Sequence, residues 1–73
     1  MREFILDSEY IELVKLLKHL GIAETGGHAK MMVESGQVLL NGKPEFRKRA
    51  KLRANDEVEA IGIKIRIKLS AKD

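Results

Sequence analysis

GQVLLNGK, residues 36–43, carries the clearest structural signal in the sequence. An apolar run over residues 38–40 leads into Asn41-Gly42, and Asn-Gly between two extended segments is the strongest short signal for a hairpin turn, because both residues tolerate a positive φ. Pro44 cannot donate a hydrogen bond within a sheet, so we expect it in the turn or on an edge strand. The sequence therefore predicts a β-hairpin at this point.

A helix is predicted on the N-terminal side of this hairpin, over about residues 9–20. Asp7 and Ser8 are residue types that cap helices, and Glu9 and Glu12 would lie in the first turn, where the helix dipole favours acids. Gly21 is expected to end the helix. Its apolar residues recur at helical spacing, at Tyr10, Leu13, Val14, Leu17 and Leu20.

A second helix is expected between this one and the hairpin. Thr25 can cap it, Gly36 can end it, and Ala29, Met32 and Val33 would share one face. The link Gly21-Ile22-Ala23-Glu24 is short, so the two helices should pack as a pair.

Extended segments are predicted at both ends of the chain. Residues 2–6 can form a short strand, Asn55-Asp56 marks a turn, residues 58–61 read as a strand, and apolar and basic residues alternate over residues 63–69. We therefore expect a single α+β domain over residues 1–73, in which two packed helices lie against a small, mostly antiparallel β-sheet.

Positive charge is concentrated in residues 43–53, which we call the basic segment. The whole chain has a net charge of +3, whereas the basic segment alone has +5, from six cations and Glu45. If residues 46–53 are extended, four of these cations share one side of a strand, where they repel each other unless a polyanion neutralises them. Those four are Arg47, Arg49, Lys51 and Arg53.

Composition narrows the classes of function. The chain has no cysteine, which excludes disulfides, thiolate catalysis and sulfur-ligated zinc sites. His19 and His28 have no neighbouring ligand cluster, and no carboxylate lies beside a nucleophile or a Gly-rich phosphate loop, so we expect no metal, no cofactor and no catalysis. No apolar run approaches the roughly 20 residues that span a bilayer. We expect a cytoplasmic monomer with no membrane contact.

Two segments, GIAETGGHAK (residues 21–30) and GQVLLNGK (residues 36–43), resemble the S4-like (α-L) RNA-binding domain. Thr25 stands at the Ser of the family's Ser-Arg pair, Ala29-Lys30 at its Ala-Arg pair, Gly36 at the glycine that closes its second helix, and Asn41-Gly42-Lys43 at the end of its strand. Residues 55–58 resemble the family's Gly-Asp-x-Ile turn. The resemblance covers about residues 12–60 and is greatest to the short stand-alone bacterial members, the YaaA/YbcJ-like proteins.

The chain departs from the family's pattern at two places. Glu12-Leu13-Val14 stands where the family has Arg-Leu-Asp, and Gly26 stands at the Arg of the Ser-Arg pair. Two cations of the family are therefore missing, which moves the expected RNA contacts to Lys30 and the basic segment.

The resemblance and the charge distribution together imply binding to structured RNA, either ribosomal or transfer RNA, with ribosomal particles as a further partner. Gly26 and Gly27 would leave helix amides open to phosphate or would permit a close approach of the two helices. Lys15 and Lys18 could flank the same surface, although pairing of Glu12 with Lys15 would also explain Lys15. The expected RNA-binding residues are Lys15, Lys18, Thr25, Gly26, Gly27, His28, Lys30, Lys43, Arg47, Lys48, Arg49, Lys51 and Arg53.

Two other functions remain open. A DNA-binding module also uses a short helix pair and positive charge, but residues 26–30 offer few side chains that read bases. A protein-interaction module could dock on a ribosomal or acidic protein through the same cations. Base-stacking platforms are not expected, because Tyr10 and Phe46 are predicted to lie in the core.

Overall fold

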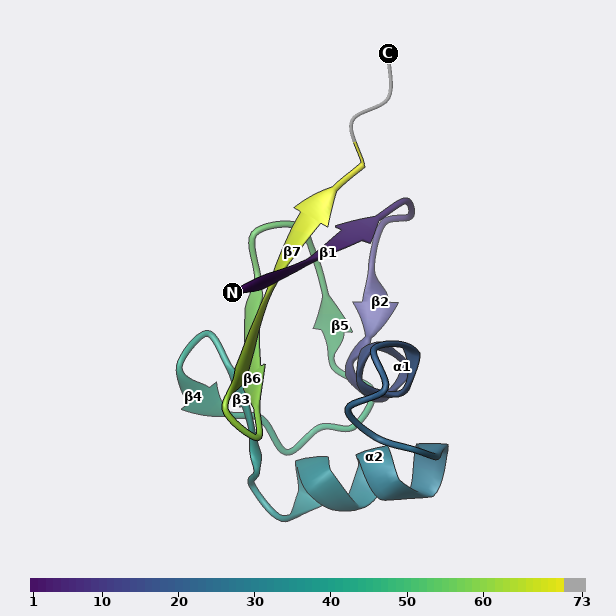
Figure 1. Cartoon of the computed structure of the whole chain (residues 1–73), viewed down its shortest axis with the longest axis vertical. Helices are drawn as coiled ribbons and strands as arrows, with labels where there is room; N and C mark the ends of the chain where they lie inside the picture. The colour runs from purple at the N-terminus through teal and green to yellow at the C-terminus, as the bar shows by residue number, and fades with distance from the viewer. Residues whose placement is uncertain (71–73) are drawn as a thin grey trace.

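A five-stranded sheet with the strand order β1-β7-β6-β3-β4 forms one side of the computed structural model, which describes residues 1–70 (Figure 1). β1 runs parallel to β7, and the other neighbours in this sheet are antiparallel. Helices α1 and α2 pack together on the other side, and β2 pairs with β5 in a separate two-stranded sheet. The elements are β1 (Arg2–Leu6), β2 (Ile11–Glu12), α1 (Leu13–His19), α2 (Gly26–Glu34), β3 (Val38–Leu40), β4 (Lys43–Pro44), β5 (Lys51–Leu52), β6 (Glu57–Ala60) and β7 (Ile63–Leu69).

The predicted hairpin is confirmed as β3 and β4. Leu40 pairs with Lys43 across a two-residue turn, and Asn41 and Gly42 have φ values of 52° and 85°. Pro44 lies in β4, which is an edge strand of this sheet. Proline has no amide hydrogen, but among residues 1–70 no further strand lies beside β4 that would need one. The predicted strands over residues 2–6, 58–61 and 63–69 correspond to β1, β6 and β7, and the α+β prediction is confirmed.

The second helix is also as predicted. Thr25 is its N-cap, and the Thr25 hydroxyl accepts a hydrogen bond from the His28 amide at 3.0 Å. Gly36 follows the helix with φ of +80°, the left-handed conformation that ends many helices.

The predicted start of the first helix is wrong. Residues 9–12 are not helical: Ile11 and Glu12 form β2, and α1 begins at Leu13 with no side-chain cap. The reason is a partner distant in sequence, since Ile11 pairs with Leu52 and Glu12 with Lys51. Acids at residues 9 and 12 are typical of the first turn of a helix, but the pairing of β2 with β5 determines the backbone conformation of residues 11 and 12.

The predicted strand over residues 46–53 is wrong for most of its length. Only Lys51–Leu52 is a strand, and the chain turns before it, where the Ala50 amide donates to the Arg47 carbonyl at 3.1 Å. Figure 1 shows this stretch crossing from β4, at the edge of the large sheet, to β5 beside β2. The cations of the basic segment therefore do not alternate along a continuous strand.

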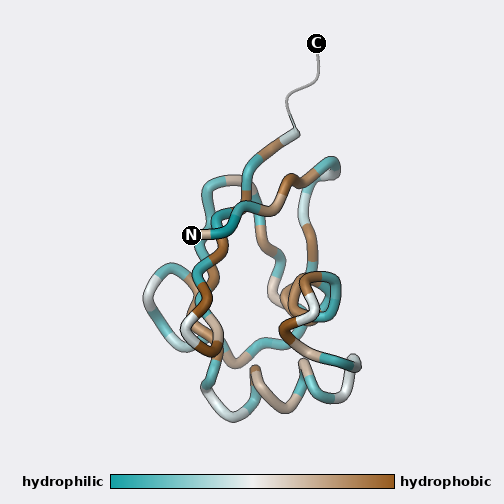
Figure 2. The backbone as a smooth tube through the Cα atoms, in the orientation of Figure 1, coloured by the Kyte–Doolittle hydropathy of each residue, from teal (hydrophilic) through white to brown (hydrophobic). Residues whose placement is uncertain are grey.

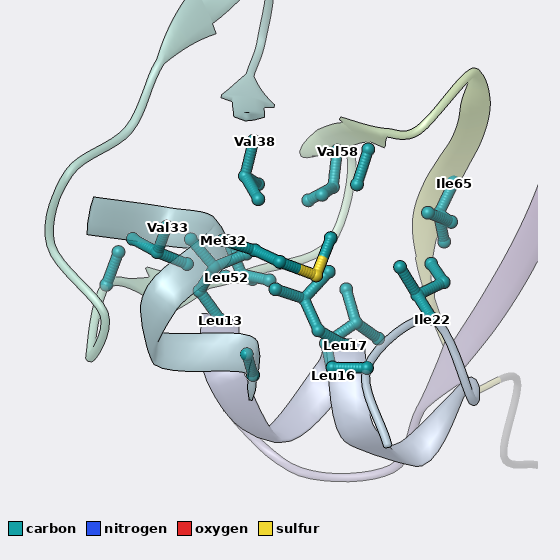
Figure 3. Packing of buried hydrophobic residues seen from close by; sticks show 14 of the residues in the cluster. Leu13, Leu16, Leu17, Ile22, Met32, Val33, Val38, Leu52, Val58 and Ile65 are labelled. Carbon is teal, nitrogen blue, oxygen red and sulfur yellow. The ribbon is translucent and has the colours of Figure 1, made fainter. Parts of the chain in front are cut away.

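The hydrophobic core fills the space between the large sheet and the two helices. Figure 2 shows hydrophobic stretches of the backbone in both the sheet and the helices, and Figure 3 shows Val38, Val58 and Ile65 of the sheet pointing toward Leu17 and Met32 of the helices. Within residues 1–70, nine large side chains are less than 2% exposed, among them Leu13, Leu16, Leu17 and Leu52. No helix within residues 1–70 is long and apolar enough to cross a membrane.

Gly36→Ala and Gly26→Ala are expected to have opposite effects on stability. Alanine at position 36 would adopt a φ of +80° and bring its Cβ within 3.4 Å of Phe46 Cε1, which should destabilise the fold by about 1–2 kcal/mol. Alanine at position 26 would meet no atom within 4 Å and has better helix propensity, so about 0.5–1 kcal/mol of stabilisation is expected. Urea denaturation measures both changes, and equal stability of the two variants would contradict the role given to Gly36.

Candidate nucleic-acid interface

The second half of the basic segment is fixed to the first helix by backbone hydrogen bonds. The Leu13 amide donates to the Ala50 carbonyl at 2.9 Å, and the Val14 amide donates to the Lys48 carbonyl at 3.1 Å. These carbonyls satisfy amides at the start of α1 that a side-chain cap would otherwise satisfy. Ala50 and Leu52 are buried, so the cations between and beside them are held on an anchored backbone.

Each arginine of the basic segment forms an ion pair with a carboxylate. Arg47 Nε lies 3.0 Å from Glu45 Oε2, Arg49 Nε lies 3.3 Å from Glu12 Oε2, and Arg53 Nη1 lies 3.3 Å from Glu9 Oε1. With Glu9 and Glu12 included, the local charge falls from +5 to +3. Three of the four cations expected on one face are therefore ion-paired, Arg47 with the nearby Glu45, and Arg49 and Arg53 with acids that the pairing of β2 with β5 brings to this surface.

The Glu45–Arg47 ion pair shifts the pKa of both of its partners. Hydrogen bonds from the Arg47 side chain and amide hold the pKa of the Glu45 carboxyl below its usual value, and the same pair raises the pKa of Arg47. The lowered pKa extends the ionised state of Glu45, and with it this ion pair, toward lower pH.

The arginines nevertheless stay accessible to a ligand. The Arg47 and Arg49 side chains are 78% and 76% exposed. Arg49 donates to Glu12 through Nε, which leaves both terminal nitrogens free for other acceptors. The carboxylates thus orient the guanidinium groups toward solvent without using all of their donors.

The predicted lysines differ from the arginines of the basic segment in having no carboxylate partner within 4 Å among residues 1–70. Lys51 Nζ lies over the Tyr10 ring, 4.8 Å from its centroid, and Lys48 is half-buried. The exposed members of this group are Lys15, Lys18, Lys30, Lys43 and Lys51.

The start of α2 is open. A Cβ on Gly26 would touch nothing within 4 Å, and one on Gly27 would meet only the Thr25 hydroxyl at 3.9 Å, so close helix packing does not explain these glycines. His28 Nδ1 accepts a hydrogen bond from the Glu24 amide at 3.2 Å, which gives His28 a local structural role. Among residues 1–70, no hydrogen bond or ion pair joins the start of α2 to the basic segment; the predicted binding residues concerned are Thr25, Gly26, Gly27 and His28.

Glu12, which stands where the family pattern has an arginine, has a structural role in this chain. It does not pair with Lys15 but with Arg49, and it accepts that bond at the junction of β2 and α1. Sequence reasoning missed this role, as it missed the role of Glu9. The available signal was Ile11, which lies off the apolar stripe of the predicted helix and therefore argues for strand there.

Two aromatic side chains predicted to be buried are exposed. Tyr10 is 37% exposed and Phe46 is 61% exposed. Tyr10 precedes β2 rather than facing the core from a helix, and Phe46 lies against Gly36 on the surface. The expectation that both rings lie in the core, away from any ligand, is therefore wrong.

Within the described residues, no three His, Cys or acidic side chains are grouped as a metal ion would require.

Comparison with known proteins identifies the family. Residues 4–68 match the family model of the S4 domain. The "Putative RNA-binding protein YbcJ" of Escherichia coli (strain K12) is 38% identical over 58 residues, which cover 80% of this chain and 83% of that protein. The "Probable ribosome maturation protein RlbA" of Bacillus subtilis (strain 168) is 37% identical over 57 residues, 78% of this chain and 80% of that protein.

A solved structure agrees with this result. The solution structure of YbcJ from E. coli, described as having an α-L motif involved in RNA binding, superimposes with a TM-score of 0.71 and 36% sequence identity, over 93% of this chain and 87% of that one. The resemblance to the short YbcJ-like proteins is thereby confirmed, and the chain belongs to the S4 domain family.

Proposed function

We propose that this protein binds structured RNA, ribosomal or transfer RNA, through the basic segment and neighbouring lysines, and that it catalyses no reaction. The observation that carries the proposal is an anchored backbone, tied to α1 by the Ala50 and Lys48 carbonyls, that displays six cations within eleven residues. Membership of the S4 domain family and the RNA-binding name of YbcJ support it. The name of RlbA favours ribosomal RNA and ribosomal particles over transfer RNA.

Lysines and arginines would share the work of binding. Lysines act as point charges that meet phosphates and release counterions. Arg47 and Arg49, oriented by Glu45 and Glu12, would present guanidinium forks that fit phosphate oxygens or base edges. The Glu45 and Glu12 side chains are only 14% and 16% exposed, so a phosphate would meet the guanidinium nitrogens that these carboxylates leave free rather than replace the carboxylates.

The remaining predicted residues would extend this surface. Lys15, Lys18, Lys30 and Lys43 are exposed cations, and Gly26 and Gly27 leave the start of α2 uncovered. Thr25 and His28 would act indirectly, because they shape the start of the helix. Binding of this kind needs no second subunit, and we propose a monomer that acts in the cytoplasm.

A gel-shift competition tests the choice of nucleic acid. Labelled bacterial ribosomal RNA is bound by the protein and challenged with unlabelled ribosomal RNA, transfer RNA or duplex DNA of equal nucleotide concentration. We expect either RNA to displace the label far better than duplex DNA does. Equal displacement by DNA would favour a DNA-binding module, and a protein pulldown from lysate that survives nuclease treatment would favour a protein-interaction module.

A further inference from the structure

Tyr10 stands at the edge of the basic surface. It is 37% exposed, Lys51 Nζ lies 4.8 Å from the ring centroid, and Arg53 Cζ lies 5.8 Å from it. The register places this tyrosine beside β5, because Ile11 pairs with Leu52. A partly exposed aromatic ring with Lys51 and Arg53 over it is thus present where the sequence predicted a core residue.

Two shallow hollows adjoin at this point. The first has a volume of about 420 Å³ and the second about 360 Å³, both toward the lower end of the roughly 300–1,000 Å³ typical of small-ligand sites. The Arg49–Glu12 ion pair joins them, since Glu12 lines the first and Arg49 the second, with 3.3 Å between their polar atoms. The first is lined by Ser8, Glu9, Tyr10, Ile11, Glu12 and Lys15, and the second by Arg47, Arg49, Ala50 and Lys51.

The two hollows differ in chemistry. The second has three cations and no acid among its lining residues, which suits a phosphate group. The first combines the Tyr10 ring and Ile11 with two carboxylates and one lysine, and the carboxylates disfavour a phosphate there. A flat aromatic group that carries N–H donors matches a site with a ring and acceptors at its rim.

We propose that the Tyr10 hollow binds one unpaired nucleobase of the RNA, stacked on the Tyr10 ring in place of the Lys51 ammonium, while the adjoining backbone phosphate lies in the hollow of Arg47, Arg49 and Lys51. Glu9 and Glu12 accept hydrogen bonds from the amino or imino groups of the base, and Lys15 lies on the same wall. The inference rests on the proposed function and adds to it that the bound RNA has an unpaired nucleotide next to its structured part.

The tyrosine itself reports on this site, because the chain has one tyrosine and no tryptophan. Saturation of the wild-type protein with bacterial ribosomal RNA or bulk transfer RNA is expected to quench Tyr10 emission, with N-acetyltyrosinamide in the same RNA solutions as the correction for absorbed light. Tyr10→Leu should weaken binding by about 5- to 150-fold, the usual effect of losing one stacked base, while Tyr10→Phe keeps near wild-type affinity. Phe4→Leu is the matched control, since it replaces an aromatic ring of β1 that lies outside both hollows and outside the basic segment.

The outcomes separate the two proposals. If the wild-type protein binds neither RNA, the proposed function fails and the Tyr10 site fails with it. If it binds RNA but Tyr10 emission is unchanged at saturation, or a folded Tyr10→Leu variant binds as tightly as wild type, the Tyr10 site is overturned and the proposed function stands. Should Tyr10→Leu not fold, the emission of the wild-type protein decides.

Discussion

RNA binding is expected to be lost when Arg47 and Arg49 are both replaced by glutamate, while the domain stays folded. Their side chains are 78% and 76% exposed, so neither substitution disturbs the core. Each new glutamate would face the acid that formerly paired with the arginine, Glu45 or Glu12, and four like charges would then repel phosphate. A loss of affinity on the order of 100-fold or more is expected, because charge-assisted contacts become repulsive ones.

The matched control for this variant is Arg2→Glu with Lys64→Glu. Both residues are exposed and lie in β1 and β7, outside the basic segment. Either double substitution changes the net charge from +3 to −1, so a difference in affinity between the two variants cannot come from net charge. Filter binding to ribosomal RNA compares them. Equal losses would mean that net charge alone drives binding and that the basic segment is not the site.

Leu52→Ala is expected to destabilise the fold by about 2–5 kcal/mol, as other truncations of buried leucines do. Leu52 is fully buried, lies in β5 opposite Ile11, and follows the Ala50 carbonyl that holds the start of α1. Its truncation leaves a cavity where the basic segment is fastened to the core. A chain of 73 residues has little stability to spare, so much of the population should unfold at 37 °C.

Urea denaturation followed by circular dichroism measures this change. Leu69→Ala is the matched control, because Leu69 undergoes the same truncation at the end of β7 with 64% of its surface exposed. The control should lose only a few tenths of a kcal/mol, as surface substitutions do. Similar losses in both variants would show that Leu52 is not an anchor of the basic segment.

Local signals in the sequence predict most of the fold. Asn41-Gly42, Thr25 and Gly36 each determine the backbone through their own chemistry, a positive φ or a capping hydroxyl, so the hairpin and α2 are where the sequence places them. The strand β7 follows from alternation alone. The start of α1 could not be predicted from local signals, because β2, which precedes it, forms by pairing with Lys51 and Leu52, some forty residues further along the chain.

The candidate site could be predicted in composition but not in arrangement. The sequence shows that cations gather in residues 43–53, but their alternation suggests a strand where the chain turns at Arg47 to Ala50. Pairing of β2 with β5 brings Glu9, Tyr10 and Glu12 to this surface, and no local pattern could reveal that. The same long-range pairing therefore accounts for the ion pairs of Arg49 and Arg53 and for the exposed tyrosine, whereas Arg47 pairs with Glu45, two residues away.

If several anchored cations of the basic segment meet RNA phosphates, binding must weaken as salt concentration rises, and the salt dependence of the affinity measures this directly. If roughly five phosphates are contacted, log K against log salt concentration should fall with a slope of about −3.5 to −4.5, and the Arg2→Glu, Lys64→Glu variant should keep that slope. A slope near zero for the wild-type protein would contradict phosphate recognition by this surface.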